Sequence, residues 1–152
     1  MNYFVYQTPI GPLTICEEQE KIVVISTHRP LQAGTERETE VIRQAHTQLS
    51  EYFEGRRKTF DLPLAPKGTP FQQRVWQALC DIPYGETRSY KQVAQAVGNA
   101  KGARAVGMAN NRNPLMIVVP CHRVTGSDGQ MVGYAAGIEK KEYLLRLEGS
   151  LL

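Results

Sequence analysis

The stretch SYKQVAQAVGNAKGARAVGMANN, residues 89–111, decides the fold of the C-terminal part of this chain. Ser89 followed three residues later by Gln92 has the form of a capping box, and the apolar residues after it share one face of a short helix. Gly98 ends that helix, and a second helix is expected over about 101–111. Two helices joined by a tight turn that contains glycine are typical of a helix-turn-helix.

The second predicted helix is built almost wholly from small residues, which let a helix lie close to whatever it meets. One interpretation is close packing on a neighbouring helix, in which Val106 and Met108 would take part. The other is close approach to a DNA backbone. Helix-turn-helix proteins usually read the major groove with polar side chains, and this helix offers few of them. Sequence-specific readout is therefore not expected.

An apolar run, residues 115–119, follows the helix pair and is interpreted as a buried strand that ends at Pro120. The three residues after the proline are Cys121, His122 and Arg123. Cationic neighbours favour the thiolate form of a cysteine, which is its reactive form. We therefore expect Cys121 to be a nucleophile. Further helices are expected from Thr69–Pro70 and over about 138–148.

The sequence of the N-terminal part contains no recognisable catalytic or ligand-binding motif. Short strands are expected at 3–7, 12–17 and 21–26, and a helix that Thr35 and Glu38 would cap runs to residue 53. The predicted fold class is α+β. A small α/β domain with a short antiparallel sheet and a helix (residues 1–65) precedes a mainly helical, winged-helix-like domain with the helix-turn-helix (residues 66–152).

Composition points to a globular protein of the cytoplasm. The 152 residues are 41% hydrophobic and 22% charged, and no apolar run is long enough to cross a bilayer. The first residues lack the pattern of a signal peptide. Three cysteines without paired spacing favour a reducing compartment, and Cys16 and Cys80 are interpreted as inert packing residues.

Charge is unevenly distributed along the chain. Residues 1–65 carry 7 Lys and Arg against 9 Asp and Glu, whereas residues 66–152 carry 11 against 6. Within 88–123 there is no acidic residue. A solvated basic face would explain this, but the overlap with the helix-turn-helix favours a phosphate-binding surface. Its basic residues would be Arg88, Lys91, Lys101, Arg104, Arg112 and Arg123.

Five motifs resemble, in order and spacing, those of the O6-alkylguanine-DNA alkyltransferases over about residues 69–149. They are IPYGETRSY (82–90), GARAVG (102–107), NP (113–114) with VPCHRV (119–124), GYAAG (133–137) and LEG (147–149). The resemblance implies a DNA repair protein that transfers the alkyl group of O6-alkylguanine, and of O4-alkylthymine as a further substrate to be tested, irreversibly to its own cysteine.

The resemblance also implies the catalytic residues. Cys121 would accept the alkyl group, with His122 as its base and Glu148 as the carboxylate that orients the histidine. Tyr90 would donate a proton to guanine N3. Asn113 would brace the turn that holds the cysteine. Without the resemblance, His122 would more often be structural than catalytic, Glu148 would be interpreted as a solvated charge, and Tyr90 as a core residue of the short helix.

The resemblance also implies that the protein binds DNA in the minor groove and extrudes the target nucleotide from the duplex. Arg104 would be the arginine finger that takes the place of this nucleotide. The other DNA-binding residues would be Ala103, Ser89, Gly107 and Arg112. The pocket for the alkylated base would be lined by Tyr134, Ala135, Met131 and Val132.

We expect no cofactor and no metal site, because Cys16, His28 and His46 are scattered. The expected partner is double-stranded DNA that contains alkylated bases, bound by a monomer, with cooperative assembly on DNA left open. Three alternatives remain. A non-reactive protein that flags alkylated bases would lack Cys121, a transcriptional regulator would need polar recognition side chains, and a thiol hydrolase would turn over without DNA.

Overall fold

The structure is a computed structural model that describes residues 1–28, 34–131 and 133–151. The chain divides into two compact units, Met1–Lys67 and Gly68–Leu152. The boundary predicted from the sequence lies two residues earlier, between residues 65 and 66. Each unit has buried apolar residues of its own, so each is described by itself.

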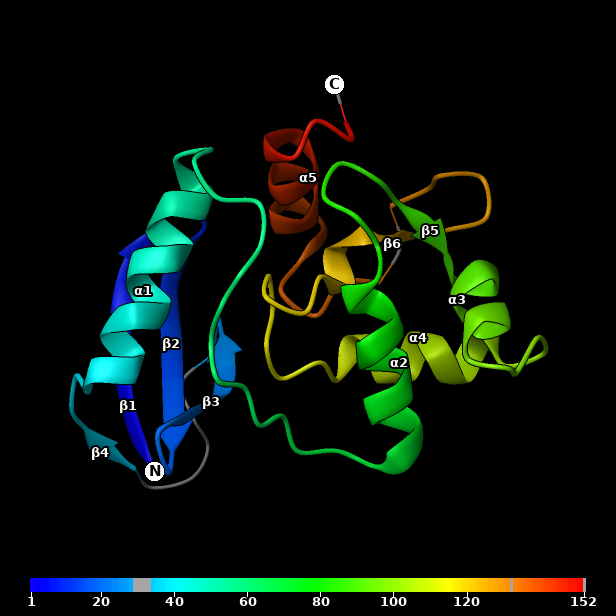
Figure 1. Cartoon of the computed structure of the whole chain (residues 1–152). Coiled ribbons are helices and arrows are strands. Elements are labelled where there is room, and N and C mark those ends of the chain that lie inside the picture. The colour runs from blue at the N-terminus through cyan, green and yellow to red at the C-terminus, as the bar shows by residue number, and fades with distance from the viewer. Residues whose placement is uncertain (29–33, 132, 152) are drawn as a thin grey trace. The chain divides into compact units, whose positions relative to one another are not determined.

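The first unit is a four-stranded sheet covered by one helix (Figure 1). The strand order is β3-β2-β1-β4, with antiparallel pairs except for β4, which is parallel to β1. Apolar residues of β2 and of the helix face each other and are almost fully buried, which forms the core. The elements are β1 (Asn2–Thr8), β2 (Gly11–Glu18), β3 (Lys21–Ser26), β4 (Thr35–Glu36) and α1 (Glu40–Phe53).

The start of α1 differs from the prediction. Thr39, not Thr35, is the N-cap, and its hydroxyl accepts a hydrogen bond from the backbone N–H of Ile42. Thr35 lies in β4 instead. Glu38 cannot complete the predicted capping box, because its carboxylate accepts hydrogen bonds from the Tyr6 hydroxyl and from Arg43. A tertiary partner has therefore displaced the local motif.

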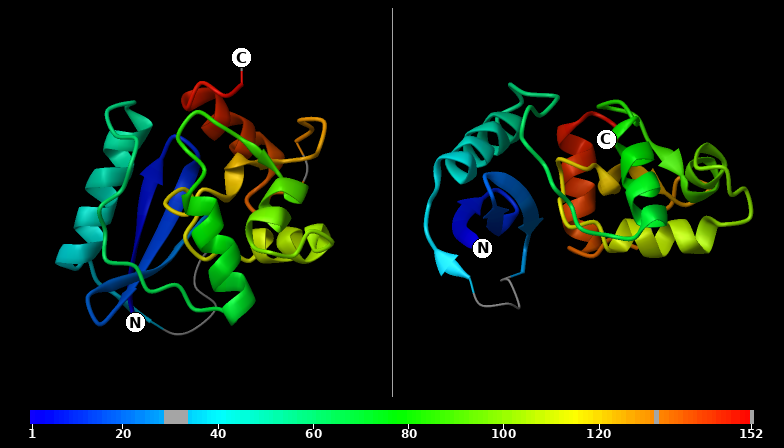
Figure 2. Two further views of the ribbon diagram at one scale, coloured as in Figure 1. Left: turned by 45° about the vertical axis from the view of Figure 1, so that its right-hand side comes forward. Right: turned by 60° about the horizontal axis from the view of Figure 1, so that its bottom comes forward.

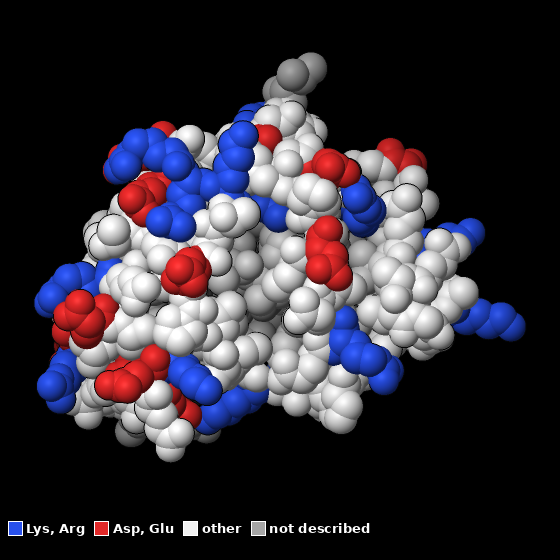
Figure 3. Space-filling model, in the orientation of Figure 1, with Lys and Arg blue, Asp and Glu red and all other residues white. Residues whose placement is uncertain are grey.

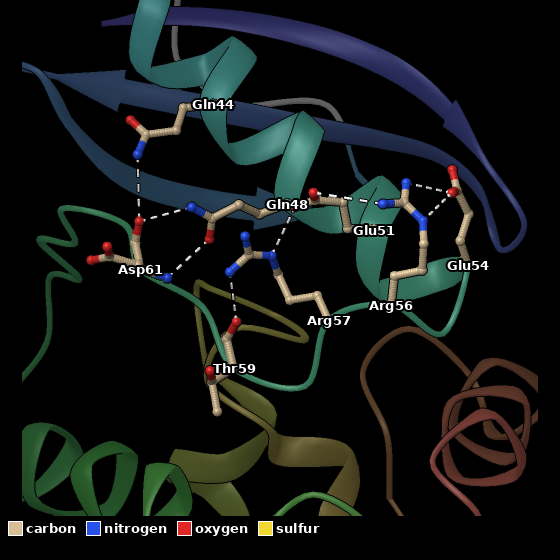
Figure 4. A network of polar contacts seen from close by, with 8 residues as sticks. All are labelled: Gln44, Gln48, Glu51, Glu54, Arg56, Arg57, Thr59 and Asp61. Carbon is tan, nitrogen blue, oxygen red and sulfur yellow. Dashed lines mark hydrogen bonds and ion pairs between the residues drawn. The ribbon is translucent and has the colours of Figure 1, made fainter.

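Polar side chains of α1 hold the segment that follows it (Figure 4). The Gln48 amide donates to the backbone carbonyl of Asp61 and accepts from its N–H, both at 2.9 Å. Arg57 pairs with Glu51 at 2.9 Å and donates to the carbonyl of Thr59. The basic and proline-rich segment that leaves α1 is thus tied to the first unit by side-chain contacts.

The second unit is mainly helical, with α3 and α4 forming the helix-turn-helix (Figure 2). Capping boxes at Thr69 and Ser89 start α2 and α3, which confirms both predicted helix starts. The indole N–H of Trp76 donates to the carbonyl of Ala109 at 2.9 Å and joins α2 to α4. The elements are α2 (Pro70–Cys80), β5 (Arg88–Ser89), α3 (Tyr90–Ala96), α4 (Ala103–Asn111), η1 (Cys121–Arg123), β6 (Val124–Thr125) and α5 (Ile138–Leu147), with β5 parallel to β6.

The predicted buried strand at 115–119 is wrong. All of its residues except Val118 are buried, but the chain folds back on itself in tight turns, and Ile117 has a φ of 75°. The backbone N–H of Val119 donates to the carbonyl of Leu115, a spacing of four residues that an extended strand does not permit. A short apolar run indicates burial but not the conformation of the backbone.

Within the described parts of the chain, no helix is both long and apolar enough to span a membrane. The longest, α1, has 14 residues, and a span requires roughly 20.

Candidate active site

Cys121 is the first residue of the 3-10 helix η1, and its exposed fraction is 5%. The turn in front of it is braced by Asn113. The amide of this residue donates to the carbonyl of Val119 at 2.7 Å and accepts from the N–H of Leu115 at 2.9 Å. Because these bonds hold both ends of the turn, they fix the position of the backbone directly before Cys121. Asn113 therefore has the bracing geometry that the resemblance implied.

His122 and Glu148 form a fully buried hydrogen-bonded pair. Nε2 of His122 lies 2.7 Å from Oε2 of Glu148, and both side chains are 0% exposed. Glu148 caps the C-terminus of α5, so the carboxylate comes from an element 26 residues along the chain. Nδ1 of His122 is buried and has no hydrogen-bond partner in the described ranges. The pair thus leaves one ring nitrogen available for proton transfer.

Arg123 is part of the same cluster, and its predicted place on a basic surface is wrong. Its guanidinium donates to both oxygens of Glu148, at 2.8 and 3.0 Å, and to the carbonyl of Ile82 at 2.7 Å. The centre of the Tyr84 ring lies 5.7 Å from the guanidinium carbon of Arg123. The Tyr84 hydroxyl donates to the carbonyl of Leu147. Because the charge is buried against a carboxylate, Arg123 is a clamp for Glu148 and is not available to phosphate.

The electrostatics of the thiol also differ from the prediction. Burial raises the pKa of Cys121, and contacts with Asn113, Lys141 and Tyr134 oppose that rise only in part. Burial lowers the pKa of His122, although the Glu148 carboxylate acts in the other direction. The resting pair at neutral pH is therefore a thiol beside a neutral imidazole. The adjacent cations expected to favour thiolate do not do so, because Arg123 is neutralised by Glu148 and His122 is uncharged.

Lys141 is a site residue that sequence reasoning missed. It lies on α5, is 0% exposed, and donates from Nζ to the carbonyl of Val124. Its ammonium is 5.9 Å from the centre of the Tyr134 ring and is within electrostatic range of Cys121. Burial lowers the pKa of Lys141 to about 8, and Cys121 acts against this shift. Nothing in the sequence indicated that Lys141 would be buried at the site, since a lysine in an amphipathic helix is usually solvated.

The pocket residues differ in their placement. Tyr134 is buried, and its side chain acts to lower the pKa of Cys121, against the larger effect of burial. Met131 is half-buried and Ala135 is exposed, so neither encloses the thiol as Tyr134 does. Val132, which was also predicted to line the pocket, lies outside the described residues. The Tyr90 hydroxyl reaches this segment, where it donates to the carbonyl of Gly133 at 3.3 Å.

The predicted DNA-binding residues cluster on α3, α4 and their ends. Arg104 and Arg112 are exposed, and within the described residues neither belongs to an ion pair. Ser89 caps α3, Ala103 opens α4, and a side chain at Gly107 would meet the Tyr90 ring at 3.8 Å. Where α3 and α4 meet the solvent, Figure 3 shows only Lys and Arg among the charged side chains.

The small-residue helix α4 packs through some residues and not others. Val106 is 0% exposed, as close packing requires, whereas Met108 is 56% exposed and is not part of the core. In the parts of the chain that are described, no three His, Cys, Asp or Glu side chains gather closely enough to hold a metal ion. The three cysteines are all free thiols.

Two family descriptions match the chain. Residues 70–150 match the 6-O-methylguanine DNA methyltransferase DNA binding domain, and residues 1–66 match the ribonuclease-like domain of the same methyltransferase.

Individual proteins are similar over nearly the whole length. A methylated-DNA–protein-cysteine methyltransferase of Methanosarcina acetivorans is 47% identical, with 99% of each chain covered. A constitutive one of Bacillus subtilis is 49% identical, with 97% of this chain and 96% of that protein covered. The crystal structure of Mycobacterium tuberculosis OGT in complex with DNA has a TM-score of 0.93 at 43% identity and covers 99% of this chain and 94% of its own.

Proposed function

The chain belongs to the 6-O-methylguanine DNA methyltransferase family, and from this membership we propose that it repairs DNA by transferring the alkyl group of O6-alkylguanine to the sulfur of Cys121. The enzyme is a methylated-DNA–protein-cysteine methyltransferase, as its close relatives are named. The observation that carries the proposal is the buried thiol of Cys121 followed directly by the buried His122–Glu148 pair.

The chemistry follows from the protonation states at rest. The thiol loses its proton to the neutral imidazole of His122, through Nδ1, either directly or by one water molecule. Sγ then forms a bond to the alkyl carbon while the bond from that carbon to O6 breaks. Tyr90 gives its proton to guanine N3, so the base leaves neutral, and the imidazolium later returns a proton to Tyr90. Glu148 stabilises the imidazolium, as in catalytic triads.

One molecule acts once. The product is a thioether, and none of the described residues at the site offers a means of cleaving its carbon–sulfur bond. The alkylated protein is therefore the end of the reaction, and no cofactor takes part in it.

Two observations support the proposal that this protein binds DNA. A similar protein has been crystallised in complex with DNA, and α3 and α4 present exposed basic side chains. Lys91, Lys101, Arg104 and Arg112 are exposed in a stretch without acidic residues, as phosphate binding requires. We propose that α4 enters the minor groove and that Arg104 fills the place of an extruded nucleotide. The short side chains of Ala103 and Gly107 allow the close approach of the helix to the backbone.

In this proposal Tyr134 lines the substrate pocket, and Met131 and Ala135 lie on the same segment at its edge. A base that reaches Cys121 must leave the duplex, because a stacked base cannot present O6 to a thiol inside the protein. The extrusion costs about a few kcal/mol, and the stacking of a guanidinium offsets part of it.

We propose that the protein acts as a monomer and that it is located in the cytoplasm. Every residue in the proposed mechanism belongs to one unit of one chain, so a second copy is not needed. Three free thiols fit a reducing compartment. Sedimentation with and without duplex DNA separates monomeric from cooperative binding.

The test is intact-protein mass after incubation with duplex DNA that contains O6-methylguanine, followed by peptide mapping. We expect one methyl group per molecule, on Cys121 and never more. Cys80, an exposed thiol of the same chain, is the internal control for non-specific alkylation. Tight binding to the lesion without a change in mass would contradict the transfer and favour a protein that only flags damage.

A further inference from the structure

Arg123 carries its charge in a place from which water is excluded. Its side chain is 8% exposed, and that of Glu148, which it contacts, is 0% exposed. Burial of a charge is unfavourable unless the charge is paired and hydrogen-bonded inside the protein. Even then, a buried ion pair is often no more stable than apolar residues of the same volume. Stability alone therefore does not account for a guanidinium beside the nucleophile.

Arg123 and His122 both contact the carboxylate of Glu148. Nε and Nη2 of Arg123 lie 2.8 and 3.0 Å from Oε1 and Oε2, and Nε2 of His122 lies 2.7 Å from the same Oε2. Nη1 of Arg123 donates to the carbonyl of Ile82 at 2.7 Å, which holds the guanidinium in place. Because a guanidinium is always charged and only donates, contact with both oxygens favours the ionised form of Glu148.

The ionised carboxylate determines where the hydrogen of His122 lies. A carboxylate can only accept, so the bond of 2.7 Å to Glu148 requires a hydrogen on Nε2. Burial lowers the pKa of His122, so the imidazole is neutral at rest and carries one hydrogen in total. Nδ1 is then left with its lone pair. This nitrogen is buried and has no hydrogen-bond partner among residues 1–28, 34–131 and 133–151.

This protonation state depends on the charge of Arg123. Arg123, ionised Glu148 and neutral His122 together have no net charge. Without the guanidinium, the other two would hold one buried negative charge, which is costly, and uptake of one proton would neutralise them. That proton belongs to the pair, as carboxylate with imidazolium or as carboxylic acid with imidazole. Nδ1 carries a hydrogen in both forms, because a carboxylic acid that donates to Nε2 leaves the hydrogen of the imidazole on Nδ1.

Other ionisable groups also lie near the pair. Lys141 on α5 lowers the pKa of His122, as Arg123 does, but it has the smaller effect of the two cations. Burial raises the pKa of Tyr84 and of Cys121, so both are uncharged at rest. Arg123 is therefore the cation that acts most strongly on the histidine.

We propose that Arg123 is a positioning residue: its buried charge keeps Nδ1 of His122 free of a proton at rest, so that this nitrogen can accept the proton of the Cys121 thiol. The role in catalysis rests on the proposed function, whereas the protonation state belongs to the free protein. In the reaction, the thiol proton moves to Nδ1, and Sγ bonds to the alkyl carbon as the bond to O6 breaks and its electron pair goes to guanine. The imidazolium that results is already paired with the ionised Glu148.

The first test is ¹⁵N NMR of protein with labelled histidine, without DNA, at about pH 7. The chain has three histidines, His28, His46 and His122, so the ring nitrogens can be assigned from single substitutions. We expect the wild type to have a hydrogen on Nε2 of His122 and none on Nδ1. Arg123→Gln removes the charge but keeps a donor, and it should place a hydrogen on Nδ1. Arg123→Lys retains the charge and should resemble the wild type.

The second test is the single-turnover rate constant of methyl transfer from duplex DNA as a function of pH. An opposite charge at this distance changes a pKa by about one to three pH units. Arg123→Gln should therefore slow transfer about 10-fold at about pH 6 and less than about 3-fold at about pH 8, because the added proton is lost as the pH rises. Arg123→Lys should follow the wild type at both pH values.

Arg57→Gln is the matched control for both measurements. In the first unit, Nε of Arg57 pairs with Oε1 of Glu51 at 2.9 Å, and Nη1 donates to the carbonyl of Thr59 at 3.0 Å (Figure 4). The guanidinium thus has the same kinds of contact as that of Arg123, but to a carboxylate without a histidine. Its replacement should change neither the His122 spectrum nor the pH dependence of transfer.

The outcomes are distinguishable. If Nδ1 carries no hydrogen in Arg123→Gln at about pH 7, or if this variant slows transfer by the same factor at both pH values, Arg123 does not act through the histidine proton and the inference is overturned. If the wild-type protein shows the expected spectrum but transfers no methyl group, the proposed function fails, because the spectrum does not depend on transfer. If Arg123→Gln does not fold, Arg123→Met, which also lacks the charge, takes its place.

Discussion

Replacing Glu148 with glutamine should destabilise the protein strongly. The carboxylate is 0% exposed and accepts from His122 at 2.7 Å and from Arg123 at 2.8 and 3.0 Å. Glu148→Gln keeps the shape and one acceptor oxygen but leaves the buried guanidinium without its counter-charge. Breaking a buried ion pair in this way costs about 3–5 kcal/mol, and we expect the lower end because one acceptor remains. For a chain of this size, that loss lowers the melting temperature by about 6–12 °C.

The assay is urea unfolding at neutral pH, with Glu142→Gln as the control. Glu142 lies on the same helix, where it pairs with Arg146 at 3.9 Å, and the two side chains are 36% and 56% exposed. Its loss should change the free energy of unfolding by about 0.5 kcal/mol or less. Adding Arg123→Met to Glu148→Gln removes the unpaired charge and should recover about 1–3 kcal/mol relative to the sum of the single changes. Equal effects at positions 148 and 142, or strict additivity, would refute the reasoning.

Three other changes test the chemistry, the DNA contact and the buried lysine. Cys121→Ser should abolish alkyl transfer in the mass assay while duplex binding persists, and residual transfer would remove Cys121 as the acceptor. Arg104→Ala should slow repair of duplex DNA far more than reaction with free O6-methylguanine, and equal slowing would exclude the finger role. Lys141 has a pKa of about 8 in the fold against 10.5 ordinarily, so above about pH 8 the unfolded chain binds a proton that the folded chain does not. The free energy of unfolding of the wild type, relative to Lys141→Met, should therefore rise from about pH 8 to about pH 10, by up to about 1.4 kcal/mol per pH unit. A flat difference would mean that Lys141 titrates normally.

Where a structure depends on neighbours in the chain, the sequence was sufficient to predict it. The capping boxes at Thr69 and Ser89 place a side chain and a backbone N–H only three residues apart, so the starts of α2 and α3 follow from local chemistry. The helix-turn-helix follows from the same signals. The alkyl-transfer chemistry was likewise predictable, because the motifs that carry the family resemblance are short and contiguous in the chain.

Where a group has alternative partners, only the tertiary structure decided between them. Glu38 has the spacing of a capping residue, yet Tyr6 and Arg43 engage its carboxylate. Arg123 follows the nucleophile in a basic stretch, yet Glu148, 25 residues away, takes its charge. The apolar run at 115–119 indicates burial, but its turns depend on the bonds that Asn113 makes. Lys141 carries no local signal, because what makes a polar side chain part of a site is the set of distant groups that it meets once water is excluded.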